Sequence, residues 1–156
     1  MLLCPPTGID PSPQSALPAT HRFWRVLVDE NYQDTYLSIA EVEMAETPGG
    51  TDITAPGFAI SGGDRGASWA TEQAFDDDGA TAWSILRSAG ASNLWIGQDF
   101  GIGNERAIAE IRLTARSDFT SGHSTALHMP AQWRLQYSDD GLVWQDAWTV
   151  AREAPW

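Results

Sequence analysis

The sequence predicts a single all-β domain, and three observations support this fold class. Apolar residues make up 42% of the 156 residues and include eight tryptophans, whereas only 19% are charged, which is typical of a packed globule. Nine prolines and fourteen glycines favour many turns. Several stretches alternate apolar and polar residues with the period of two that half-buried strands require. The length fits one hydrophobic core.

The first 20 residues differ from the rest of the chain in composition. They contain five of the nine prolines, with Ser, Thr and Gly between them, so neither a helix nor a strand ladder is expected. We expect an extended N-terminal arm over 1–20, followed by one domain over 21–156. Such an arm is either a disordered terminus or a segment that docks onto other subunits of an assembly.

The first strands are expected at 22–28 and 36–44, separated by a polar loop. In the first strand, Phe23, Arg25 and Leu27 share one face, and the alternate residues share the other. A short strand is expected at 57–61. Residues 68–75 favour one or two helical turns, because Ser68 suits a helix start and Glu72 falls in the first turn.

Later strands are expected at 94–101 and 107–116, and a long loop without periodicity at 117–130. Residues 132–144 predict a strand, a turn at Asp140-Gly141 and a returning strand. The tryptophans in strand or hairpin contexts are assigned to the core, and two others are expected to be exposed. The core set is Trp24, Trp83, Trp95, Trp133 and Trp144, and the exposed pair is Trp69 and Trp156.

The segment 73–83 stands out chemically. Three consecutive carboxylates, at 76–78, precede Gly79, which permits positive φ, and the hydroxyl of Thr81, and Phe75 and Trp83 bracket the turn. Such a turn is either a loop that binds a hard cation through oxygen atoms or a solvated acidic turn. The EF-hand pattern fails on spacing, because its glycine and closing glutamate positions hold other residues.

This segment resembles the signature of discoidin domains, the coagulation-factor C-type or galactose-binding-like modules. The matching positions are Ala74, Phe75, Asp76, Asp78, Thr81 and Trp83, whereas Asp77 stands where the family usually has glycine. The runs 94–101 and 138–144 also resemble discoidin strands, so the resemblance covers about 22–150. The order is rotated, since the strand pair around Ala40-Glu41 usually closes such domains. The resemblance therefore implies a circularly permuted jelly-roll β-sandwich.

The resemblance also implies two sites. A structural Ca²⁺ site would be formed at the acidic loop and the permuted strand, by Gln73, Asp76, Asp78, Thr81, Ala40 and Glu41. For sugar binding, a guanidinium can donate to adjacent hydroxyls and a ring can stack on a pyranose. Arg116 matches the arginine of sugar-binding members, whereas Ser84 replaces the usual loop histidine. The candidate ligand-binding set is Arg116, His123, Arg87, Tyr32 and Trp69.

Net charge is −12 and every cationic side chain is one of nine arginines. An acidic surface repels nucleic acid and anionic membranes, so neither is expected as a partner, whereas neutral sugars, cations or proteins are suitable. No apolar run approaches the about 20 residues needed for membrane insertion. No classical signal peptide is expected, because a basic region and a long apolar segment are missing before Cys4.

Catalytic motifs are absent from the sequence, and neighbouring carboxylates in one turn do not face each other across a sugar. The chain is therefore expected not to be an enzyme. We expect a non-catalytic carbohydrate-binding adhesion module for cell-surface or capsular polysaccharide. Short discoidin-like chains resemble phage adhesion modules, which implies a virion-like particle subunit, oligomeric or displayed multivalently. The alternatives are a structural connector of such a particle and an accessory module of a secreted glycosidase.

Overall fold

The computed structural model of the chain describes residues 19–32, 35–87, 93–117 and 125–151. These residues form antiparallel strands with only short 3₁₀ turns between them, which confirms the all-β prediction. The strands are β1 (Phe23–Asn31), β2 (Tyr36–Ile39), β3 (Glu41–Ala45), β4 (Ala59–Ser61), β5 (Trp83–Leu86), β6 (Trp95–Asp99), β7 (Glu110–Thr114), β8 (Pro130–Ser138) and β9 (Gln145–Val150). The 3₁₀ turns are η1 (Pro56–Phe58), η2 (Ala67–Trp69), η3 (Thr71–Ala74) and η4 (Thr125–His128).

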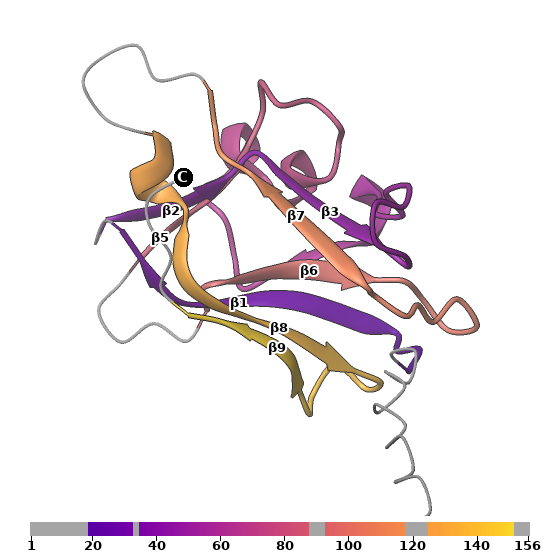
Figure 1. Cartoon of the computed structure of the whole chain (residues 1–156). Coiled ribbons are helices and arrows are strands. Elements are labelled where there is room, and N and C mark those ends of the chain that lie inside the picture. Colours follow the sequence, from indigo (N-terminus) through magenta and orange to yellow (C-terminus); the bar gives the residue numbers. More distant parts are fainter. Residues whose placement is uncertain (1–18, 33–34, 88–92, 118–124, 152–156) are drawn as a thin grey trace, which may run out of the picture.

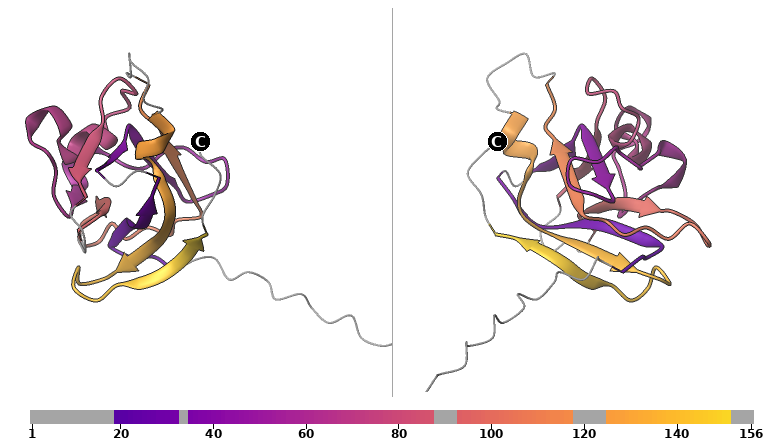
Figure 2. Two further views of the ribbon diagram at one scale, coloured as in Figure 1. Left: turned by 90° about the vertical axis from the view of Figure 1, so that its left-hand side faces the viewer. Right: turned by 45° about the vertical axis from the view of Figure 1, so that its right-hand side comes forward.

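The strands form one large sheet and two small ones. The five-stranded sheet has the order β4-β6-β1-β8-β9, so β1 lies at its centre between β6 and β8. Two pairs, β2-β5 and β3-β7, form separate two-stranded sheets. Both pairs lie on the same side of the five-stranded sheet, as Figure 1 and the two views in Figure 2 show. The molecule therefore has two β layers.

The hydrophobic core lies between these layers. On β1, Trp24, Val26 and Val28 are buried, whereas Phe23, Arg25 and Leu27 are only half-buried, as the alternation predicts. Burying these apolar faces supplies the main driving force for folding. The opposite layer and the neighbouring strands add further fully or nearly fully buried side chains: Leu37, Ile39, Val42, Met44, Trp83, Ile96, Trp133 and Leu135.

The assignment of Trp95 and Trp144 to the core is wrong. Trp95 pairs with Leu27, which shares with Phe23 and Arg25 the face of β1 that points away from the core. On this outer face the guanidinium of Arg25 lies 3.8 Å from the ring centroid of Trp144 and 5.1 Å from that of Trp95. The two rings pair with a cation at the sheet surface, which explains why large aromatic residues occur there.

Several expected elements have different limits. The single strand expected at 36–44 is two strands, because the chain changes sheets at Ala40, whose amide donates to the Thr114 carbonyl oxygen at 2.8 Å. The expected helical turns are η2 and η3. The hairpin turn at Asp140-Gly141 is confirmed, with Gly141 at φ 72.

Some expectations fall on residues that the structure does not describe. These are most of the expected arm (1–18), His123 and Trp156, whereas residues 19 and 20 are exposed. Among the described residues, no helix has the length and apolar character needed to cross a membrane.

Candidate functional site

The acidic loop connects η3 to β5 and contains Asp77, whose backbone conformation is unusual. Asp77 has φ 58, in the left-handed region that glycine favours and that aspartate tolerates better than most residues. Gly79 permits positive φ but does not adopt it here. Asp77 occupies the position where the discoidin signature carries glycine. The left-handed conformation explains how the loop closes with Asp77 in that place.

Oxygen atoms crowd around the hydroxyl of Thr81. Thr81 Oγ1 lies 2.9 Å and 3.0 Å from the two carboxylate oxygens of Asp76, 3.0 Å from the carbonyl oxygen of Asp78 and 3.2 Å from that of Gln73. A hydroxyl has one proton, so it can donate fully to only one of these acceptors. Asp76 Oδ1 and the carbonyl oxygen of Asp78 also accept from the backbone N–H groups of Asp78 and Thr81, at 3.1 Å and 2.9 Å. Carboxylate and carbonyl oxygens nevertheless converge on one hydroxyl, and a hard cation is a partner that such an oxygen cluster suits.

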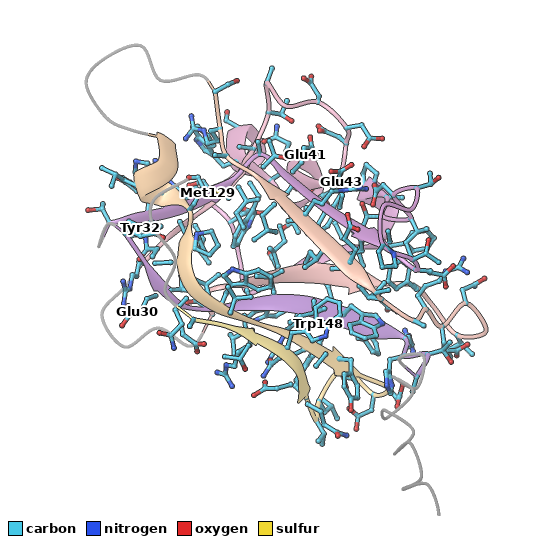
Figure 3. All side chains as sticks on the ribbon, viewed as in Figure 1. Glu30, Tyr32, Glu41, Glu43, Met129 and Trp148 are labelled. Atoms are coloured by element: carbon cyan, nitrogen blue, oxygen red, sulfur yellow. The ribbon has the colours of Figure 1, made fainter. Side chains whose placement is uncertain are left out.

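Glu41, the first residue of β3, brings a second carboxyl group to this loop. Its residue surface is 8% exposed, and burial raises its pKa to about 7, with further contributions from the nearby carboxylates of Asp76 and Asp77. Hydrogen bonding from the backbone N–H of Asp77 partly opposes that increase. Figure 3 labels Glu41 at the start of β3. Ala40, which precedes it, is fully buried.

Two side-chain oxygens at this loop accept no hydrogen bond from the described residues. They are Glu41 Oε1 and Gln73 Oε1, and both are buried. A buried acceptor without a partner costs free energy, in the range of about 1–3 kcal/mol. The orphaned carboxylate oxygen of Glu41 therefore fits a bound cation that would neutralise it.

The ligand atoms available to a cation are of mixed type. Within the described ranges, no three His, Cys, Asp or Glu side chains come together so as to hold a metal ion. A cation would thus depend on two carboxylates, from Asp76 and Glu41, supplemented by the Thr81 hydroxyl and by carbonyl oxygens of Gln73 and Asp78. Such an all-oxygen set suits Ca²⁺ better than metals that prefer nitrogen or sulfur.

A row of alternating cations and rings lies close to the acidic loop. The guanidinium of Arg116 lies 4.1 Å from the ring centroid of Trp69, and that of Arg65 lies 5.4 Å from the same ring and 4.2 Å from Tyr36. Ser117, next to Arg116, donates to the carbonyl oxygen of Gly79 at 3.5 Å. We call Arg116, Trp69, Arg65 and Tyr36 the arginine–aromatic cluster.

Arg87 joins this cluster through hydrogen bonds. Its guanidinium donates to Asn31 Oδ1 at 2.7 Å, and Asn31 Nδ2 donates to the carbonyl oxygen of Tyr36 at 2.8 Å. Tyr32 follows Asn31 at the end of β1 and is half-buried (Figure 3). The imidazole of His128 lies 3.3 Å from the same Tyr36 carbonyl oxygen. Arg116 and Trp69 thus belong to the cluster and Arg87 is linked to it through Asn31, whereas Tyr32 adjoins it only as the residue after Asn31.

Sequence reasoning missed Arg65 and Tyr36. Arg65 lies in a glycine-rich segment without periodicity, and Tyr36 reads as an ordinary strand residue, so no local pattern identifies either. Ser84, at the place of the usual loop histidine, is fully buried and hydrogen-bonded to the Leu37 carbonyl oxygen at 3.0 Å. It therefore belongs to the β2-β5 sheet and not to a ligand site.

Comparison with known proteins places the chain in no family: no family model, curated protein or solved structure matches it. What the loop and the cluster can do follows from their own chemistry. Guanidinium groups in a row can donate to several hydroxyls or to a carboxylate, and a half-exposed indole can stack on the apolar face of a sugar ring. Hydrogen bonding by guanidinium groups and stacking by an aromatic ring are therefore both available within one surface region of the molecule.

Proposed function

We propose that this protein is a non-catalytic carbohydrate-binding adhesion module that recognises cell-surface or capsular polysaccharide. The observation that carries the proposal is the arginine–aromatic cluster. Arg116, Arg65 and Arg87 gather at one end of a protein whose net charge is −12, and two rings lie between or beside them. Concentrating cations and rings in one place on an acidic protein is expected where a ligand binds.

The fold that we infer is a circularly permuted jelly roll of the discoidin type. The two-layer, all-β arrangement supports it, as does the contact between Glu41 and the acidic loop. In discoidin domains the strand that carries these residues closes the chain. Here it precedes the loop, yet Glu41 still meets Asp76, as the permutation predicts.

We propose Ca²⁺ as a structural ion of the acidic loop. Asp76, Glu41 and Thr81 would hold it with their side chains, and Gln73, Asp78 and Ala40 with backbone carbonyl oxygens. When bound, Ca²⁺ neutralises the converging carboxylates and fixes the loop. Because Ser117, in the segment after β7, donates to Gly79 of this loop, a fixed loop would also help to hold the neighbouring Arg116 in place.

We propose further that the protein is a subunit of a phage or phage-like particle and binds through many copies at once. Single sugar-binding sites are commonly weak. Multivalent display raises the effective affinity by about 10²–10⁴ without any new contact. The oligomer, or the particle that displays it, would then supply the adhesion that one copy cannot.

The test is a glycan screen with a multimerised protein in calcium, using bacterial capsular and outer-membrane polysaccharides. Arg116→Ala is expected to weaken binding about tenfold or more, because charge-assisted hydrogen bonds are lost. Arg112→Ala is the matched control, since Arg112 lies on β7 and pairs with Glu43 and Glu110, each at 3.2 Å. Equal loss in both variants, or no binding by the parent protein, would contradict the proposal and favour the structural connector.

A further inference from the structure

A groove lies away from the arginine–aromatic cluster, between β9 and the start of β1. Its volume is about 280 Å³, close to the lower end of ligand-site volumes. Four rings line it, together with Ala19, Ile108, Ala147 and the acidic side chain of Asp146. The rings are those of His21, Trp24, Tyr137 and Trp148. Figure 3 shows Trp148 by the five-stranded sheet, whereas Glu41 lies beside the other layer.

One wall of the groove is a fixed stack of rings. The imidazole of His21 lies on Tyr137 with 3.8 Å between centroids and 16° between planes, and Trp24 meets His21 edge-on at 5.7 Å. His21 Nδ1 is held by Asp139 at 3.0 Å. The rings of this wall are therefore already in position before any ligand binds.

The other wall is Trp148, on the edge strand β9. Trp148 pairs with Leu135, a core residue, so it faces the inner side of the sheet, yet it remains 37% exposed. A large exposed ring opposite a fixed stack is an aromatic-lined groove. Grooves of this type bind proline-rich segments, whose polyproline II conformation loses little entropy on binding and whose rings pack against the aromatic faces.

The chain carries such a segment directly before Ala19 in the sequence. Residues 1–18 contain five prolines and end next to Ala19, which lines the groove. They include one charged side chain, Asp10, so they are the part of this acidic protein that can approach another copy with the least repulsion. In polyproline II geometry, 18 residues span about 55 Å, more than the roughly 37 Å diameter of a domain this size.

We propose that the proline-rich segment 1–18 of one copy binds in the aromatic groove of a neighbouring copy. The contact is heterologous, because the segment and the groove are different surfaces. Repetition of such a contact builds a ring or an open chain of subunits. This assembly does not depend on glycan binding, so either proposal can fail alone.

Complementation between two full-length variants tests the proposal. One variant carries Trp148→Ala in the groove, and the other carries alanine at the five prolines of the segment, which are Pro5, Pro6, Pro11, Pro13 and Pro18. Sedimentation velocity is expected to show self-association of the parent protein and monomers for each variant alone. An equimolar mixture of the variants is expected to form 1:1 complexes, because one supplies the segment and the other the groove.

Two controls keep the outcome interpretable. Leu142→Ala changes an apolar side chain that is 84% exposed at the β8-β9 turn, and it is expected to self-associate like the parent protein. Trp148→Phe keeps a ring in the groove and is expected to retain most of the association, while near-ultraviolet circular dichroism checks the fold of every variant.

Three results would overturn the proposal. The first is a parent protein that stays monomeric up to millimolar concentration. The second is self-association that persists in each of the two variants alone. The third is association of the parent protein without complex formation in the mixture. Saccharide binding that is lost with Trp148→Ala in a monomeric protein would instead assign the groove to a glycan.

Discussion

Glu41 shows how one buried carboxyl group can couple pH to the acidic loop. Its folded-state pKa of about 7 lies above the ordinary value of 4.5, because it is buried and faces the carboxylates of Asp76 and Asp77. In calcium-free protein between about pH 4.5 and 7, the folded state therefore keeps a proton on Glu41 that the unfolded state releases. The contribution of Glu41 to stability is full below pH 4.5 and is lost as the pH rises through about 7.

Glu41→Gln is expected to change stability in a pH-dependent way. Without calcium, we expect the variant and the parent protein to unfold at similar urea concentrations at pH 5. At pH 8 the variant should be more stable by on the order of 1–3 kcal/mol, because it removes a buried negative charge. Urea unfolding with a chelator measures this difference. Equal destabilisation by the substitution at both pH values would contradict the assigned environment of Glu41.

Asp77 provides a second prediction at the residue scale. Because Asp77 has φ 58, Asp77→Gly is expected to relieve backbone strain and raise stability by up to about 1 kcal/mol, whereas Asp77→Ala should lower it by about 1–2 kcal/mol. Asp77→Asn tolerates the same conformation and controls for the loss of charge. Urea unfolding measures the stability of the three variants. Equal stability of the alanine and glycine variants would argue against the left-handed turn.

Strand β6 carries a prediction at the scale of the element. A Cβ on Gly97 would overlap the carbonyl oxygen of Trp24 and the backbone of Arg25, since β6 and β1 approach closely there. Gly97→Ala is therefore expected to cost at least about 3 kcal/mol or to prevent folding. Gly57→Ala is the control, because nothing lies within 4 Å of its added Cβ. Thermal unfolding compares the two, and similar melting temperatures would contradict the pairing.

Local pattern predicted the faces of β1 and the hairpin turn, because both depend on residues adjacent in sequence. It failed where the outcome depends on how strands pair. Trp95 lies outside the core because it pairs with Leu27, which is on the outer face of β1, and not with one of the alternate, buried residues of that strand. Trp148 faces inward after a register shift between Leu135 and Gln136, which nothing in the sequence of β9 signals.

The candidate site was predictable to the extent that short motifs carry it. The spacing of Asp76, Asp78 and Thr81 indicated an oxygen-rich turn, and these groups do converge. Arg65 and Tyr36 were not predictable, because their roles arise only when two loops and a strand meet. Single residues in aperiodic segments carry no signal of their partners.

Calcium is expected to stabilise the whole molecule, since the proposed ion links the acidic loop to β3. Added Ca²⁺ at about 100 times its dissociation constant should raise stability by about 2.7 kcal/mol. Mg²⁺ at equal concentration should have a smaller effect, because it requires a more regular, smaller coordination shell. Scanning fluorimetry measures both, with Glu41→Gln as the variant expected to lose the calcium response. No shift at millimolar calcium would argue against the ion.

We propose that glycan binds at the arginine–aromatic cluster. The most direct measurement is a ¹H–¹⁵N NMR titration with an oligosaccharide from the best-binding polysaccharide, following the indole N–H signals. Trp69→Phe and Trp148→Phe assign the two signals that matter. We expect the Trp69 signal to shift with added saccharide and the Trp148 signal to stay in place. A titration that leaves Trp69 unchanged, or that shifts only Trp148, would contradict it.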